Sequence, residues 1–174
     1  MANRTAQLVA VLAIGAASMK GAAQAEACAL LPSEAIRQAT GEAVTAAKGA
    51  TAIVGKLRQS QCFYSLPTFT NSISVTLTSP VGLSRDAARE RWERSFHGEG
   101  DHDSAAGEEK EAAAKAEPLS GVGDEAFWVH SFVGNLYVRK GNRYIRISLG
   151  GKMTDEERRT RAKALAAVAL RQLR

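Results

Sequence analysis

Two histidines and three carboxylates lie within the seven residues from His97 to Asp103, with His102 as the second histidine. Imidazole and carboxylate groups are ligands of zinc and related divalent ions. The spacing matches no established metal site, and the two glycines of the segment leave its side chains without a fixed geometry. We therefore expect a solvated acidic loop that binds no metal tightly, with His97 and His102 as weak candidate ligands.

Other arrangements of catalytic residues are poorly supported. The sequence contains no G-x-S-x-G elbow, and its three histidines offer few general bases for a serine hydrolase. Its paired carboxylates are adjacent in sequence, and adjacent side chains on a helix or strand point apart, so they do not indicate a glycosidase. The segment Gly121-Val122-Gly123-Asp124 lacks the lysine and the following helix of a phosphate-binding loop, and fits a turn before a strand. These observations favour a protein that is not an enzyme and needs no cofactor.

The first 25 residues have the pattern of an export signal. Arg4 precedes an apolar run over residues 8–17, and Ala23-Gln24-Ala25 supplies the small residues that signal peptidase recognises. The apolar run is shorter than the roughly 20 residues of a transmembrane helix. We expect cleavage after Ala25 and a single periplasmic or secreted domain over residues 26–174.

Cys28 and Cys62 are the only cysteines of the chain. Export to an oxidising compartment predicts a disulfide between them. A lipid anchor on Cys28 is the alternative, but Glu26 stands where a lipobox requires a small neutral residue, and lipidation would leave Cys62 unpaired. The disulfide is the favoured interpretation, and a bridged cysteine cannot act as a thiolate nucleophile.

The charges are unevenly distributed along the chain. Residues 26–138 contain 10 Lys and Arg against 15 Asp and Glu, whereas residues 139–174 contain 11 against 3. A basic C-terminal part suits an anionic lipid, glycan or polymer, and it equally suits a solvated helix face. The modest net charge of +5 on an exported chain argues against nucleic acid as a partner.

Local patterns place helices and strands in the N-terminal half. Pro32-Ser33 and Gly41 bound a first helix, and Ser84 caps a second helix whose buried stripe is Ala88, Trp92 and Phe96. Residues 42–59 are weakly patterned and fit one strand and a loop. With their bounds, the two helices are predicted at 34–40 and 84–96. Strands are predicted at 61–66 and at 72–78, and the second of these has one buried and one polar face.

The C-terminal half predicts a three-stranded meander followed by a long helix. Gly134-Asn135 and Gly141-Asn142 each separate β-rich runs, as in tight hairpin turns. Thr154 and Glu157 form a capping box that opens the last helix. The predicted strands are 125–133, 136–140 and 143–149; residues 97–124 are mostly loop, with a helical turn or two at 108–115. The inward residues of the last helix are Ala162, Leu165, Ala166, Ala169 and Leu173.

The predicted order is α-β-β-α-loop-β-β-β-α, which is compatible with two similar halves that each place a helix beside a small antiparallel sheet. Helices packed on an antiparallel sheet define an α+β fold. The sequence therefore predicts one exported α+β domain.

Three short motifs are spread over this domain. They are Cys28-Ala29-Leu30-Leu31 before a helix ending at Gly41, Cys62-x-Tyr64 on a strand, and Gly121-x-Gly123-Asp124-Glu125-Ala126-Phe127 before a hairpin. Together they resemble a set of small exported bacterial proteins of unknown function that carry a CALL-type start, a C-x-Y strand and a GxGDxA segment. Many of those proteins are lipoproteins. The resemblance implies a fold and a cell-envelope setting, and it supplies no catalytic residues.

Cross-strand pairing over the two tight turns gathers aromatic and basic side chains on one face of the meander. The predicted pairs are Arg139–Tyr144, Tyr137–Arg146, Phe132–Tyr137 and His130–Arg139. The resulting candidate binding face contains Trp128, His130, Phe132, Tyr137, Arg139, Tyr144 and Arg146. The opposite face, predicted to be core, contains Phe127, Val129, Val133, Leu136, Val138, Ile145, Ile147 and Leu149. A helix or the long acidic loop covering the aromatic face is the alternative, and a one-residue slip would also redistribute these side chains.

The candidate face gives the leading functional interpretation, a non-catalytic cell-envelope protein that binds an anionic or glycan-like envelope component. Stacking and charge-assisted hydrogen bonds would supply the recognition. An accessory or structural envelope protein without a small ligand is the second interpretation. A metal-dependent enzyme using residues 97–103 is the third and weakest. The sequence indicates no oligomeric state.

Overall fold

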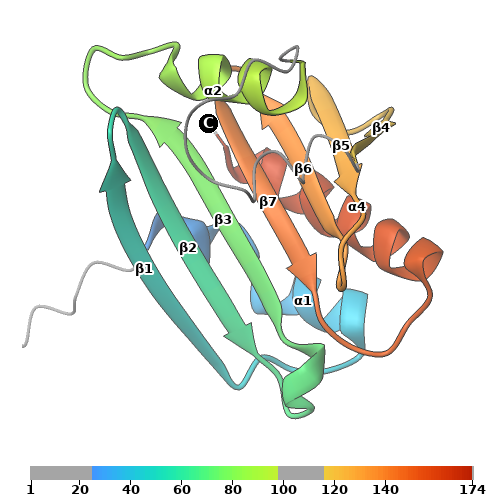
Figure 1. Cartoon of the computed structure of the whole chain (residues 1–174). Helices are drawn as coiled ribbons and strands as arrows, with labels where there is room; N and C mark the ends of the chain where they lie inside the picture. The colour runs from blue at the N-terminus through green and yellow to red at the C-terminus, as the bar shows by residue number, and fades with distance from the viewer. Residues whose placement is uncertain (1–24, 98–115, 174) are drawn as a thin grey trace, which may run out of the picture.

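The computed structural model describes residues 25–97 and 116–173 of the chain. Within these residues an antiparallel sheet carries α1 and α4 on one face and α2 on the other (Figure 1). The helices are α1 (Ser33–Thr40), α2 (Ala87–Phe96) and α4 (Asp155–Gln172), with short 3-10 helices η1 (Glu26–Ala29) and η2 (Phe69–Asn71). The strands are β1 (Ala46–Val54), β2 (Leu57–Ser65), β3 (Ile73–Pro80), β4 (Ala116–Leu119), β5 (Glu125–Val129), β6 (Asn135–Lys140) and β7 (Arg143–Leu149). The predicted α+β class is confirmed.

The two halves of the chain share one sheet of seven strands, in the order β1-β2-β3-β7-β6-β5-β4. The junction is the antiparallel pairing of β3 with β7, in which Val75 lies opposite Ile147 and Leu77 opposite Ile145. Sequence patterns predict strands in both halves but not that the two groups of strands join edge to edge. The result is one continuous sheet rather than two small ones.

The core lies between the sheet and the α1–α4 layer, on what we call the core face. Its strand residues alternate with polar ones as the pattern of residues 72–78 predicts, with Ile73, Val75 and Leu77 fully buried. The capping box of Thr154 and Glu157 is present at the start of α4. The helix residues predicted to point inward are all buried: Ala162, Leu165, Ala166, Ala169 and Leu173.

The predicted disulfide joins Cys28 to Cys62, with their Cα atoms 5.0 Å apart. It fastens η1 onto the core face, where the Ala27 amide donates to Ser60 Oγ at 3.0 Å. The Tyr64 hydroxyl lies 3.1 Å from the Cys28 carbonyl oxygen, and burial raises the pKa of this phenol to about 12. The CALL and C-x-Y motifs therefore contact each other and hold the N-terminal segment on the sheet.

Several local expectations differ from the structure. The helix predicted from Ser84 begins at Ala87, because residues 81–86 form turns and Asp86 precedes the helix without a side-chain cap. Residues 42–59 contain β1 and the start of β2, and β4 lies in a region expected to be loop. The helical turn expected at 108–115 lies outside the described residues.

The connection between β5 and β6 is also different from the predicted tight turn. β5 ends at Val129, and residues 130–134 form a loop in which Ser131 Oγ accepts from the Gly134 amide at 3.1 Å. Tyr137 therefore pairs with Phe127 instead of Phe132, and Arg139 pairs with Glu125 instead of His130. This shift of five residues is an odd number, so every β5 side chain changes face.

Candidate binding surface

The hairpin of β6 and β7 has the predicted register. Arg139 lies opposite Tyr144 and Tyr137 lies opposite Arg146, across the turn at Gly141-Asn142. These four side chains share the face of the sheet on which α2 packs, which we call the α2 face. The two Tyr–Arg pairs are two residues apart along the strands, and their surroundings differ.

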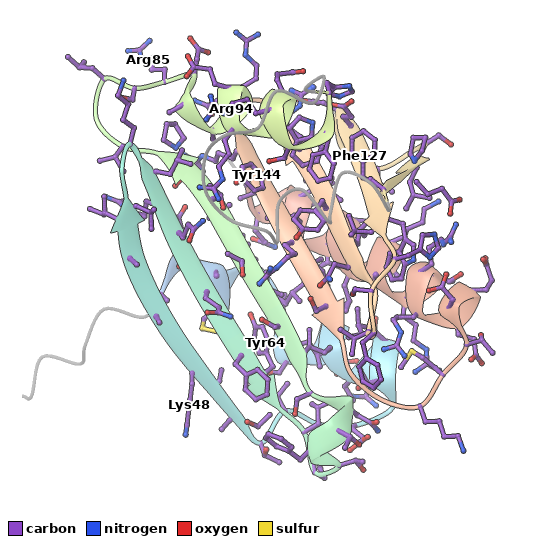
Figure 2. All side chains as sticks on the ribbon, viewed as in Figure 1. Lys48, Tyr64, Arg85, Arg94, Phe127 and Tyr144 are labelled. Atoms are coloured by element: carbon purple, nitrogen blue, oxygen red, sulfur yellow. A yellow bond between two sulfur atoms is a disulfide. The ribbon has the colours of Figure 1, made fainter. Side chains whose placement is uncertain are left out.

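Helix α2 covers the first pair at Tyr144. The Trp92 ring lies 5.6 Å from the Tyr144 ring and 5.8 Å from the Phe127 ring, and Phe96 stacks on Phe127 at 4.6 Å. Figure 2 shows Tyr144 and Phe127 beneath α2. Burial raises the pKa of the Tyr144 hydroxyl above its ordinary value, although a hydrogen bond with Thr78 opposes the rise. Tyr144 therefore belongs to a small aromatic core under α2, as the alternative of a covered face predicts.

Arg139, the partner of Tyr144, is also engaged within the fold. Its side chain is 19% exposed and lies 3.5 Å from Glu125 and 3.8 Å from Asp124. Its Nη1 donates to the Gly141 carbonyl at 3.2 Å. A guanidinium with these three partners has little capacity left for a ligand.

Glu125 connects α2 to the sheet. Its carboxylate accepts from Trp92 Nε1 at 2.6 Å and lies 2.6 Å from His97 Nε2. Burial opposes ionisation of this carboxyl, but the hydrogen bonds from Trp92 and His97 and the charges of His97 and Arg139 outweigh it, so its pKa is lowered. His97 thus serves as a partner of Glu125 at the end of α2.

The metal interpretation of residues 97–103 concerns a segment that lies almost entirely outside the described part of the chain. His97 is the single described member of that segment, and His102 lies outside the described residues with the rest of it. Across residues 25–97 and 116–173, no group of three or more His, Cys, Asp or Glu side chains is arranged to hold a metal ion.

Trp128, His130 and Phe132 do not join the candidate binding face. Trp128 lies on the core face opposite Leu136, fully buried, and its Nε1 donates to Asp155 at 3.2 Å. His130 lies in the loop after β5, 3.2 Å from Glu117, and Phe132 is fully exposed in the same loop. Burial of the Trp128 ring against α4 explains the correction, because the tight turn at Gly134-Asn135 would have placed Trp128 on the opposite face.

The second pair, Tyr137 and Arg146, lies at the margin of α2. Phe96 touches the Tyr137 ring edge-on at 5.4 Å, and both Tyr137 and Arg146 are half-buried. Arg146 forms no hydrogen bond or salt bridge with any residue in the described ranges. This contrasts with Arg139 on the neighbouring strand.

Polar side chains continue the row from Arg146 across the sheet. Thr76 of β3 lies opposite Arg146, and Gln61 of β2 lies opposite Thr76. Thr76 Oγ1 is buried and has no hydrogen-bond partner among the described residues. The next row contributes Ser74 and Ser148. Together these residues form what we call the polar surface: Gln61, Ser74, Thr76, Tyr137, Arg146 and Ser148.

The GxGDxA segment has a structural role next to this site. Gly123 has a φ of +65°, and a Cβ there would lie 2.5 Å from the Arg139 carbonyl oxygen, so the close approach requires glycine. The Asp124 amide donates to that carbonyl at 2.9 Å, and its carboxylate accepts from the Gly141 amide at 2.6 Å. The segment fastens the turn before β5 to the β6–β7 hairpin, in line with its interpretation as a turn.

Sequence reasoning missed two features of the site. The predicted face omits the polar residues of β2 and β3 and Ser148 of β7, although the alternation of residues 72–78 marks Ser74 and Thr76 as one polar face. The contact of Glu125 with Trp92 has no local signal, because 33 residues separate the two side chains.

Comparison of the chain with known protein families, with curated proteins and with solved structures finds no match. In the part of the chain that the structure describes, no helix has the length and apolar character needed to cross a membrane. The disulfide is consistent with a location outside the cytoplasm.

Proposed function

We propose that the protein is a non-catalytic cell-envelope binding protein whose polar surface takes an anionic, glycan-like component. The observation that carries the proposal is the state of Arg146, which is half-buried on a sheet face and bonded to no described residue. Among the described residues no group offsets the hydration that this guanidinium loses, and none forms an ion pair with it. A ligand carboxylate, sulfate or phosphate would supply the missing bidentate partner.

The neighbours of Arg146 suit a sugar-like ligand. Tyr137 offers an aromatic edge and a hydroxyl, and Thr76 and Gln61 offer a hydroxyl and an amide. Because neighbouring strands lie about 4.8 Å apart, the row from Gln61 to Tyr137 extends about 14 Å over four strands. An extended polymer can contact the whole row at once.

Export is part of the same proposal. The signal pattern predicts removal of residues 1–25, and the Cys28–Cys62 disulfide favours an oxidising compartment. It also disfavours a lipid anchor on Cys28, because both modifications need the same sulfur atom. N-terminal sequencing of protein recovered from the periplasm, with Glu26 as the first residue, checks the cleavage.

Binding of the mature chain to immobilised polygalacturonate and dextran sulfate tests the proposal, with carboxyl-reduced polygalacturonate and dextran as neutral counterparts. We expect binding to a charged polymer only, and a weakening of roughly ten-fold by Arg146→Gln, as for loss of one charged contact. Arg171→Gln is the matched control, because Arg171 is exposed on α4 over the other face of the sheet. Binding to neither charged polymer, equal binding to the neutral forms, or an equal effect of the two substitutions would contradict the proposal.

A further inference from the structure

The two edges of the sheet are built differently. At one edge β4 has four residues, includes Pro118, and is tied to α4 through Glu117, which lies 2.7 Å from Arg159. At the other edge β1 has nine residues, and all nine are exposed. Short length, proline and charge are the usual protections of an edge strand against pairing. β4 has all three, whereas β1 has a single charge, Lys48.

The outer edge of β1 presents backbone groups in a regular row. Val54 pairs with Leu57 across a two-residue turn, and such a flanking pair is hydrogen-bonded in a tight hairpin. Alternation along the antiparallel pair then directs the N–H and C=O groups of residues 47, 49, 51 and 53 away from β2. Among the described strands, β2 alone pairs with β1.

β1 is held in a fixed position by the N-terminal segment. A Cβ on Gly49 would lie 3.1 Å from Cys28 Sγ and 2.5 Å from the Ala25 side chain, so the chain before η1 packs directly on the middle of the strand. The disulfide to Cys62, opposite Gly49 on β2, fastens this contact. Because β1 is already ordered, only the incoming segment loses conformational entropy when it adds to the sheet.

The charge around this edge has one sign. Residues 43–85 contain no Asp or Glu, and they contain four basic residues. Three of these lie at the edge and are exposed: Lys48 on β1, Lys56 in the turn and Arg58 on β2. Their side chains form no hydrogen bond or salt bridge with the residues that the structure describes, and Figure 2 shows Lys48 extending away from the sheet.

We propose that β1 is a docking site for an extended, acidic segment of a partner protein, which adds to the sheet as an eighth strand. Backbone hydrogen bonds to the outer edge give affinity, and carboxylates on the segment pair with Lys48, Lys56 and Arg58. A second copy of this chain is a poorer occupant, because antiparallel β1–β1 pairing brings the same cations of two molecules to one seam. The site is separate from the polar surface and does not depend on the proposed function.

Fluorescence anisotropy with a labelled nine-residue peptide of alternating valine and glutamate tests this proposal. One comparison peptide carries N-methyl groups on every second amide, which removes the backbone donors, and another carries lysine in place of glutamate. On the protein, Thr51→Pro removes an outward N–H, which an edge strand tolerates, and Thr51→Ala keeps it. Lys48→Glu reverses the charge at the edge, with Lys152→Glu, on the connection from β7 to α4, as its matched control.

We expect saturable binding of the glutamate peptide, weakened at least about ten-fold by N-methylation and by Thr51→Pro, and about five-fold by Lys48→Glu. Thr51→Ala and Lys152→Glu should change the Kd by less than about two-fold. If a urea melt shows that Thr51→Pro impairs folding, the N-methylated peptide and Lys48→Glu still test the proposal. Absence of binding, equal binding of the N-methylated or lysine peptide, or a dimer in sedimentation that Lys48→Glu strengthens would overturn the proposal.

Discussion

The two Tyr–Arg pairs of the β6–β7 hairpin have the same residue types, the same strands and the same sheet face, yet α2 packs over only one of them. Arg139 and Tyr144 lie under α2, where Trp92 packs on the tyrosine and Glu125 pairs with the arginine. Tyr137 and Arg146 lie at the margin of the helix, and Arg146 has no ionic or hydrogen-bonding partner among the described residues. The difference shows that cross-strand register identifies which side chains share a face, whereas the helix above decides what they do.

The largest expected effect concerns the covered tyrosine. Tyr144→Ala removes a buried ring from the contact with Trp92, and we expect it to lower the free energy of unfolding by about 3–4 kcal/mol. Tyr137→Ala, at the margin of α2, should cost about 1 kcal/mol. Urea denaturation followed by far-UV circular dichroism measures both changes. Similar losses of unfolding free energy for the two substitutions would contradict the difference between the pairs.

A smaller effect is expected at the carboxylate that holds α2 to the covered pair. Glu125→Gln should lower the free energy of unfolding by about 1–2 kcal/mol at pH 7, since it weakens hydrogen bonds from Trp92 and His97 to a charged group. Because the pKa of Glu125 in the folded chain lies below its unfolded value of 4.5, its contribution is complete above that pH and is lost as the pH falls further.

The pH dependence provides the control for this prediction. As the pH falls from 6 to below 4.5, the difference in unfolding free energy between the unsubstituted chain and Glu125→Gln should shrink. Urea denaturation at each pH measures this difference. Glu34→Gln is a useful comparison, because Glu34 is exposed on α1 and contacts Arg37 of the same helix. A difference that stays constant with pH would exclude this role for the Glu125 charge.

Local chemistry explains which parts of the fold the sequence predicts well. The capping box of Thr154 and Glu157 and the turn at Gly141-Asn142 each depend on residues within one or two turns of chain, and both form as predicted. The disulfide follows from the two cysteines and from an N-terminal pattern typical of an export signal. The register of β6 with β7 and the two Tyr–Arg pairs follow from the turn.

The misassigned parts depend on distant contacts. A tight turn at Gly134-Asn135 is compatible with local propensity, but burial of Trp128 against α4 requires the five-residue loop and the opposite face. Likewise, the position of α2 over Tyr144 depends on Trp92 meeting residues far along the chain. The sequence therefore predicts part of the candidate site correctly. Tyr137 and Arg146 remain in the site, whereas Trp128, His130 and Phe132 do not belong to it.

The most direct test of this account is a side-by-side urea denaturation of Arg139→Ala and Arg146→Ala. Arg139→Ala should lower the free energy of unfolding by about 1–2 kcal/mol, because it leaves Glu125 and Asp124 without their cation. Arg146→Ala should change it by less than about 0.5 kcal/mol, because no described partner is lost. Equal losses, or a larger loss for Arg146→Ala, would show that Arg146 is needed for the fold and is not kept for a ligand.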